Sequence, residues 1–165
     1  MGHDITAIIL KGDFDKNLAK EFDLREKYLG FTLNLFHIDI WYAACWQHLL
    51  KTEGELEIKN IDCIGFPTDA ALAEIMKKIS GISLPQYAII KTDYFGGMGF
   101  QWASVFQGKT NADFTVRTIN QALRYLGVTK KNGLDEFETV GLDKIRVQPD
   151  YLDKYRDLYD ELGLY

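Results

Sequence analysis

Two apolar runs flank a cluster of glycines in the middle of the chain, and no other pattern in the sequence constrains the fold as strongly. The runs span residues 87–92 and 100–106, and the glycines between them are Gly96, Gly97 and Gly99. Short runs rich in β-branched and aromatic residues are typical of strands, and a short spacer that contains glycine favours a hairpin. The sequence therefore predicts an antiparallel pair of strands around this cluster.

Further elements follow from the spacing of apolar residues along the rest of the chain. Two more strands are predicted over residues 5–11 and 31–38, and the segment 56–64 is compatible with one short strand. Helices are predicted where apolar residues recur every three or four positions next to a capping or terminating residue. The first predicted helix follows Asp13, the second spans residues 40–50 after Asp39, and the third runs from Thr68 to Gly81. A fourth helix ends at Gly127, and the last begins at Pro149.

These elements interleave and include an antiparallel pair, which predicts an α+β fold. We expect a mixed sheet of four or five strands, with the helices packed mainly on one face. The chain has 165 residues, so we expect residues 1–165 to form a single globular domain that needs no metal or disulfide to fold. The C-terminal helix is amphipathic, and it docks either on its own domain or on a second subunit.

The formal net charge of −5 is concentrated at the end of the chain, where residues 135–165 hold nine acidic and four basic residues. An acidic chain without a basic stripe argues against nucleic acid as a partner. No segment approaches the roughly 20 apolar residues that a bilayer-spanning helix needs, and the apolar run near the N-terminus is too short for a signal peptide. We therefore expect no membrane partner and a cytoplasmic location.

The cysteines and histidines show no spacing typical of a metal or cofactor site. Cys45 and Cys63 belong to no CxxC motif, so we expect reduced, buried thiols, no metal and no cofactor. Cys45 and His48 lie three residues apart on a predicted helix, but their apolar neighbours favour a buried thiol over a nucleophile. His3 is expected to be exposed, because it lies close to the start of the chain.

The glycine cluster has two interpretations. It matches neither a P-loop nor a dinucleotide-binding fingerprint, because no Lys-Ser or Lys-Thr pair follows it and the next element is a strand. In the first interpretation, the glycines only allow a wide turn with a bulge. In the second, their backbone N–H groups bind a small anionic ligand. The candidate ligand-binding residues are then Asp93, Tyr94, Gly96, Gly97, Gly99 and Gln101.

A second candidate site is the His37-Ile38-Asp39 segment at the end of a predicted strand. Residues two apart on a strand face the same side, so the histidine and the aspartate can act together as a general base. Asp39 also stands where the next helix needs an N-cap, and this structural interpretation is favoured. If Asp93 ends a neighbouring strand, then His37, Asp39 and Asp93 are the candidate catalytic residues of a small hydrolase or lyase.

Five segments together resemble a family of small, uncharacterised bacterial proteins, namely the N-terminal strand with the FD that follows it, FHIDIWYAACWQ, TDYFGGMGFQWA, INQALRYLGV and DEFETVGL. The similarity runs from about residue 5 to about residue 142 and is most distinctive in TDYFGGMGFQWA. It implies a bacterial, cytoplasmic, single-domain protein. That family has no established activity, so the resemblance assigns no catalytic residue.

The hypothesis that the sequence favours is a non-enzymatic binding protein, accessory or immunity-like, that recognises another macromolecule. No catalytic motif stands out, and aromatic residues are abundant, with 10 Phe, 9 Tyr and 3 Trp. Aromatic residues are favoured at interfaces as well as in cores. A protein partner or a homodimer then needs accessible side chains near the glycines, at Tyr94, Phe95, Phe100 and Trp102. The alternatives are the small enzyme and a binder of a small anionic ligand.

Overall fold

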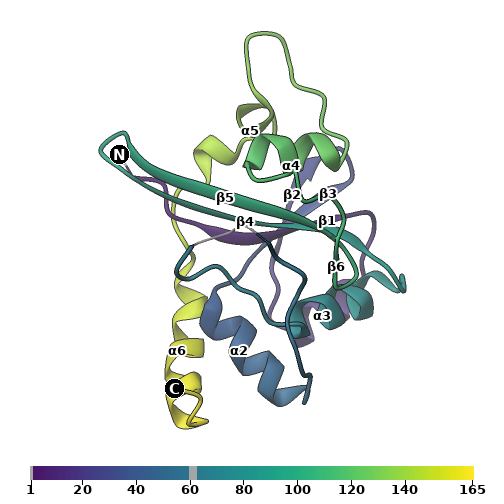
Figure 1. The fold of residues 1–165 in the computed structure, drawn as a ribbon, viewed down its shortest axis with the longest axis vertical. Coiled ribbons are helices and arrows are strands. Elements are labelled where there is room, and N and C mark those ends of the chain that lie inside the picture. The colour runs from purple at the N-terminus through teal and green to yellow at the C-terminus, as the bar shows by residue number, and fades with distance from the viewer. Residues whose placement is uncertain (1, 60–62) are drawn as a thin grey trace.

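The structure is a computed structural model that describes residues 2–59 and 63–165. Over these residues the fold is α+β, as predicted, with one six-stranded sheet and six α-helices (Figure 1). The strands are β1 (Thr6–Lys11), β2 (Glu26–Gly30), β3 (Leu33–His37), β4 (Gln86–Phe95), β5 (Met98–Gln107) and β6 (Thr110–Asn111). The helices are α1 (Lys16–Glu21), α2 (Ile40–Leu49), α3 (Ala71–Ser80), α4 (Ile119–Tyr125), α5 (Glu136–Thr139) and α6 (Asp153–Glu161). Two short 3-10 helices, η1 (Leu142–Lys144) and η2 (Asp150–Leu152), lie between α5 and α6.

The sheet has the order β2-β3-β1-β4-β5-β6, and its neighbouring strands are antiparallel. It therefore has more strands than the four or five predicted, and it is antiparallel where we expected a mixed sheet. Strand β2 was missed because its sequence, EKYLG, is exposed over its first three residues and shows no apolar alternation. Strand β6 has 2 residues, which is too short to leave a pattern in the sequence.

Helices cover both faces of the sheet, whereas the sequence predicted packing mainly on one face. In Figure 1, α4 and α5 lie above the sheet, and α2, α3 and α6 lie below it. Along β1, Ile8 and Leu10 belong to the apolar cluster of the lower face, and Ala7 and Ile9 belong to that of the upper face. A strand that is buried on both faces is apolar at every position, and this explains the uninterrupted apolar run at the start of the chain.

Local hydrogen bonds confirm two of the predicted helix boundaries. Asp39 is the N-cap of α2, and its Oδ1 accepts a hydrogen bond from the backbone N–H of Tyr42 at 2.7 Å. Gly81 ends α3 in the left-handed conformation, with a φ of 70°. Glycine adopts this conformation without steric cost, which makes it the common terminator of helices.

Two other predicted caps are wrong. The cap of α1 is Asp15, not Asp13, because the Oδ1 of Asp15 reaches two backbone N–H groups of the first turn. Helix α3 begins at Ala71 without a side-chain cap from its own segment, so Thr68 does not cap it. The N–H of Ala71 instead donates to Oε1 of Gln47 in α2 at 2.7 Å, which is a tertiary contact that local sequence cannot reveal.

The C-terminal segment docks on its own chain. Pro149 precedes η2, and α6 then packs along α2. Tyr155 of α6 is buried against Tyr42 of α2, with ring centroids 4.9 Å apart, and its hydroxyl donates to Oδ2 of Asp23 at 3.1 Å. This intramolecular packing accounts for the apolar face of the last helix.

The predicted short strand over residues 56–64 lies partly outside the described residues. The described parts of this segment, residues 56–59 and 63–64, form no strand. An isolated bridge joins Glu55 to Asp69. The backbone of Glu57 also donates to the carbonyl of Lys109 at 3.0 Å, so the segment is held by single contacts instead of a continuous ladder.

Candidate functional site

Strands β4 and β5 form a long hairpin that extends past β1 at the edge of the fold (Figure 1), and the N-terminal segment is joined to it by an isolated bridge between His3 and Tyr94. We call residues 92–102 the arm. Its turn consists of Gly96 and Gly97 alone, since Phe95 already pairs with Met98. The sequence predicted strands that stop at residue 92 and start at residue 100, with a wide turn between them. The glycine segment is therefore mostly strand, and the open loop proposed as an anion-binding nest is reduced to two residues.

Each glycine of the cluster has a geometric role. Gly96 and Gly97 have φ values of 60° and 80°, and positive φ at both central residues is what a tight two-residue hairpin turn demands. Gly99 lies opposite Tyr94 in the ladder, and a Cβ at this position would lie 2.0 Å from the carbonyl oxygen of Asp93. The backbone geometry alone thus accounts for all three glycines.

The arm has one apolar face that is open to solvent. Pairing of Phe95 with Met98 and of Asp93 with Phe100 places these side chains on one side of the arm, together with Trp102. Phe95 is 84 % exposed, Met98 80 % and Phe100 65 %. The rings of Phe100 and Trp102 stack with centroids 5.4 Å apart. We call Phe95, Met98, Phe100 and Trp102 the apolar face of the arm.

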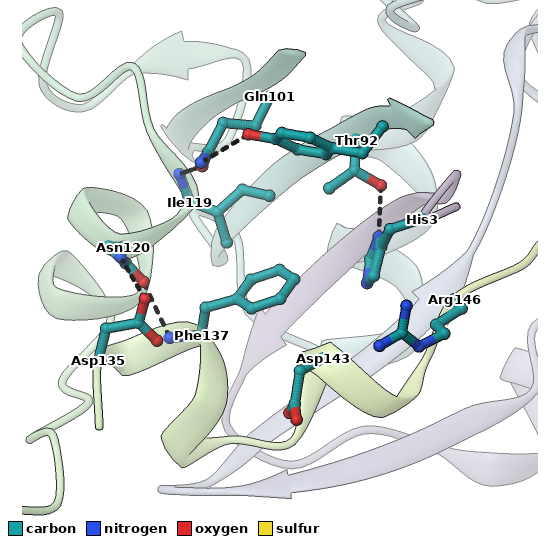
Figure 2. Close-up of a pocket in the computed structure, with 10 residues that line it drawn as sticks. His3, Thr92, Gln101, Ile119, Asn120, Asp135, Phe137, Asp143 and Arg146 are labelled. Carbon is teal, nitrogen blue, oxygen red and sulfur yellow. Dashed lines mark hydrogen bonds between the residues drawn. The ribbon is translucent and has the colours of Figure 1, made fainter. Parts of the chain in front are cut away.

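The opposite face of the arm forms one wall of a pocket of about 260 Å³ (Figure 2). Thr92, Tyr94 and Gln101 contribute from the arm. The remaining walls come from the N-terminal segment, α4, α5, η1 and the residues after it. These further lining residues are His3, Ile119, Asn120, Asp135, Phe137, Asp143 and Arg146. The structure therefore brings two of the predicted ligand-binding residues, Tyr94 and Gln101, to a pocket that the sequence did not predict.

His3 is buried in the wall of this pocket, which corrects the expectation that it is exposed. Its Nε2 lies 2.8 Å from the carbonyl oxygen of Leu142, so this nitrogen must donate. Its Nδ1 lies 2.7 Å from Oγ1 of Thr92, which already accepts the backbone N–H of Ile5 at 3.0 Å. The neutral imidazole with its proton on Nε2 satisfies all three contacts, because the threonine hydroxyl then donates to Nδ1. His3 thus ties the N-terminal segment to the arm and to η1.

The two amide side chains in the pocket are held by backbone N–H groups. Oε1 of Gln101 accepts from the N–H of Ile119 at 2.9 Å, and its Nε2 donates to the hydroxyl of Tyr94 at 3.3 Å. Oδ1 of Asn120 accepts from the N–H of Phe137 at 2.8 Å. Because a backbone N–H can only donate, both amide groups have a defined orientation, with the carbonyl oxygen used internally.

The carboxylates of the pocket are directed at structural partners or away from its centre. Asp135 is the N-cap of α5, where its Oδ1 accepts the N–H of Glu138 at 2.8 Å, and its Oδ2 accepts from Nδ2 of Asn120 at 3.2 Å. Oδ1 of Asp143 is buried and accepts no hydrogen bond among the described residues. Figure 2 shows its carboxyl group pointing away from His3 and Arg146.

Arg146 supplies the positive charge of the pocket. Its side chain is exposed, and the guanidinium group lies beside His3 at the pocket edge (Figure 2). Nη1 of Arg146 donates to the carbonyl oxygen of Gly2 at 3.4 Å, a long contact, and the described part of the chain offers it no carboxylate partner within ion-pair distance. Most of its N–H donors therefore remain available.

The candidate catalytic residues do not converge. In the sheet His37 pairs with Ala7, and Ala7 pairs with Ile90, so His37 lies on the same face as Ile90. Asp93 is three residues beyond Ile90 on β4 and therefore lies on the opposite face. Asp39 is engaged as the N-cap of α2. We therefore do not derive an active site from His37, Asp39 and Asp93.

Burial determines the ionisation of His37 and Asp39. Nδ1 of His37 donates to Oε1 of Gln148 at 2.8 Å, and this oxygen also accepts the N–H of Thr6. Burial lowers the pKa of His37, the bond to Gln148 acts against this shift, and the charge of Lys27 adds to it. Burial also raises the pKa of Asp39, although its cap hydrogen bonds oppose that change.

Cys45 is a structural thiol. It is fully buried, and its Sγ donates to the carbonyl oxygen of Tyr155 at 3.4 Å. Burial raises the pKa of Cys45 to about 11, so the nucleophilic thiolate is scarce at neutral pH. His48 of the same helix is exposed, and the two side chains share no common cleft. Cys63 is only partly buried, which differs from the prediction for that residue.

Comparisons with known proteins add no further assignment. Scans against family models, curated proteins and solved structures each return no match to this chain. The resemblance to uncharacterised bacterial proteins therefore stays a prediction. Over residues 2–59 and 63–165, no three His, Cys, Asp or Glu side chains are grouped in a way that could hold a metal ion. The helices of the same residues are too short or too polar to cross a bilayer.

Proposed function

We propose that this chain is a non-enzymatic binding protein, accessory or immunity-like, that recognises a protein partner through the apolar face of the arm. The observation that carries the proposal is the exposure of Phe95, Met98 and Phe100 on one side of a two-stranded projection. Large apolar side chains that gather in an exposed patch mark interaction sites in folded proteins. Aromatic residues and Met are also the side chains enriched at protein interfaces.

The charge pattern of the arm supports a partner with an apolar contact surface. Residues 94–106 contain no Asp, Glu, Lys or Arg, so a partner that covers this segment buries no charge from it. Asp93 lies at the border of the apolar face and is exposed. A basic residue at the rim of the partner would complement it, and such a rim charge contributes mainly to the association rate.

Cytoplasmic location and a bacterial source belong to this proposal as well, because they follow from the composition and from the resemblance described above. A second copy of the chain is the alternative partner. A standard stable interface buries about 800 Å² on each side, and three exposed side chains of about 200 Å² each supply only part of that area. A stable homodimer therefore needs contacts beyond the apolar face, whereas a transient complex with another protein can bury a smaller area.

The experiment compares three proteins. The test variant carries Phe95→Ser, Met98→Ser and Phe100→Ser. The matched control carries Ile82→Ser and Leu84→Ser, since these residues are 48 % and 58 % exposed but lie in the turn before β4. Sedimentation velocity of each protein over a wide concentration range measures self-association, and quantitative affinity capture measures partner binding.

The expected result is that wild type and control retain the same partner or the same self-association, and that the test variant loses it. Circular dichroism confirms that all three proteins are folded. Equal binding by all three proteins would exclude the apolar face as the recognition surface. Loss of self-association in the test variant would identify the partner as a second copy.

A further inference from the structure

We propose that the pocket behind the arm binds a small organic monocarboxylate with a compact apolar body. The carboxylate would contact Arg146, and the apolar body would lie against Phe137 and Ile119. This site uses the face of the arm opposite the apolar face, so the inference is independent of the proposed protein partner.

The first argument is an inventory of the hydrogen-bonding groups that line the pocket. The amide oxygens of Gln101 and Asn120 and both oxygens of Asp135 accept hydrogen bonds from the protein. Both ring nitrogens of His3 are engaged. Apart from Asp143, whose Oδ1 is buried and has no donor among the described residues, each of these acceptors therefore already has a protein donor, whereas several donors of the lining have no acceptor.

The remaining donors come from two sides of the pocket. The hydroxyl of Tyr94 accepts from Nε2 of Gln101, which leaves its own O–H group free to donate. The amide nitrogens of Gln101 and Asn120 each carry a second proton that the contacts above do not use. A site that presents donors to a ligand favours a ligand made of acceptors, and a carboxylate is the smallest common organic group of that kind.

The second argument is charge. Arg146 makes one long hydrogen bond to a carbonyl and, within the described residues, no ion pair. Each carboxylate oxygen of Asp135 accepts an N–H donor of the protein, and the carboxyl group of Asp143 points away from Arg146 (Figure 2). A guanidinium group binds carboxylates through two parallel N–H groups, which adds both strength and orientation.

The third argument is size and lining. A volume of about 260 Å³ corresponds to on the order of ten non-hydrogen atoms, at about 30 Å³ for each water-sized group. The ring of Phe137 packs against that of His3, with centroids 5.2 Å apart, and Ile119 lies beside it in the wall. These groups offer a flat apolar surface for an aromatic or branched body, which inorganic anions lack.

The test uses pairs of small molecules that differ only in charge. Benzoate and benzamide have the same shape, and isovalerate and isovaleramide form a second pair. Isothermal titration calorimetry measures the affinity, and NMR follows the side-chain amide resonances of Gln101 and Asn120. We expect saturable binding of at least one carboxylate, with its amide at least tenfold weaker and with the largest shifts at those two amides.

Two variants assign the binding to this pocket. Arg146→Gln removes the charge from an exposed side chain and should weaken carboxylate binding by about tenfold to a hundredfold, the range for a hydrogen bond to a charged group. Tyr94→Phe should weaken it by less. The matched control is Arg156→Gln on α6, across the sheet from the pocket, which should retain wild-type affinity.

The outcomes separate this proposal from the proposed function. The triple serine variant of the apolar face should bind carboxylates normally, and Arg146→Gln should retain the protein partner. Equal affinity for an acid and its amide, or unchanged binding in Arg146→Gln, would overturn the proposal. So would the absence of saturable binding for both acids. Stronger binding of inorganic phosphate than of either acid would show that the pocket does not select a ligand with an apolar body, and would overturn that part of the proposal.

Discussion

Phe100 and Gln101 are adjacent in β5 and face opposite sides of the sheet, so a single peptide bond separates the two surfaces of the arm. The ring of Phe100 is in solvent and stacks on Trp102. The amide of Gln101 is bound to the first N–H of α4 at 2.9 Å. This alternation lets one short hairpin present an apolar surface to a partner and a polar wall to a pocket. It also allows each surface to be altered without disturbing the other.

His3 should contribute to stability although it lies near the chain terminus. His3→Ala would leave the carbonyl oxygen of Leu142 without its donor and would remove a buried ring from the pocket wall. We expect the free energy of unfolding to fall by about 1–3 kcal/mol, the cost of an unsatisfied buried polar group. Urea denaturation followed by fluorescence measures the change.

The control for that prediction is His48→Ala, since His48 is exposed and a surface substitution should change stability by less than about 0.5 kcal/mol. Equal stability of the two variants would mean that the buried contacts of His3 contribute nothing.

Gly99 should not tolerate any side chain. In Gly99→Ala the new Cβ would lie 2.0 Å from the carbonyl oxygen of Asp93, so the two strands would have to separate locally. We expect a loss of more than about 2 kcal/mol and faster amide exchange in residues 92–101. Gly96→Asn is the comparison, because the space around Gly96 is open and Asn adopts positive φ more readily than other residues. If both variants were equally stable, close strand approach would not explain Gly99.

Asp39 should act through helix capping. Asp39→Ala removes the acceptor for the N–H of Tyr42 and should lower the free energy of unfolding by about 1 kcal/mol, whereas Asp39→Asn should retain most of it. Asp13→Ala, at a residue that does not cap α1, should be neutral within about 0.5 kcal/mol. Thermal unfolding by circular dichroism distinguishes the three variants. A neutral Asp39→Ala would contradict the capping role.

His37 should make the fold less stable in mild acid. Burial lowers its pKa in the folded state, so the unfolded chain takes up the proton more readily as the pH falls below the ordinary value of about 6.5. The contribution of the neutral His37 to the free energy of unfolding is therefore present above about pH 6.5 and is lost as the pH drops through the pKa of His37 in the folded state. We expect the free energy of unfolding to decline from about pH 7 to about pH 5 more steeply in wild type than in His37→Gln. His48→Gln should keep the wild-type slope.

Local patterns predicted the elements whose stabilising contacts are close in sequence. The segment after Asp39, which is apolar almost all round, predicted a helix with Asp39 as its cap, and this cap bonds to a residue only three positions along the chain. The continuous apolar run of β1 predicted a strand. Its burial on both faces, which such a run favours, was not inferred, because we expected the helices mainly on one face. Strand β2 escaped prediction because pairing with β3, not its own composition, holds it in the sheet.

The candidate site also has one part that the sequence predicted and one part that it did not. The binding hypothesis expected accessible aromatic residues near the glycines at Tyr94, Phe95, Phe100 and Trp102. The structure exposes Phe95 and Phe100, whereas Tyr94 and Trp102 are partly buried. The pocket was not anticipated, apart from Tyr94 and Gln101. No pattern within a few residues of His3 indicates that it bonds to Leu142, because 139 positions separate the two residues.

The sequence by itself determined the α+β class, the position of the arm, the start of α2 at its Asp39 cap and the end of α3 at Gly81, because backbone conformation and capping depend on neighbouring residues. Only the tertiary structure decided which faces of the sheet are covered and where the polar side chains meet. The pocket joins residues 3, 92–101, 119–120 and 135–146, and their proximity results from the burial of apolar surface on both sides of the sheet. Such packing depends on the whole chain and leaves no local signature at any one of these positions.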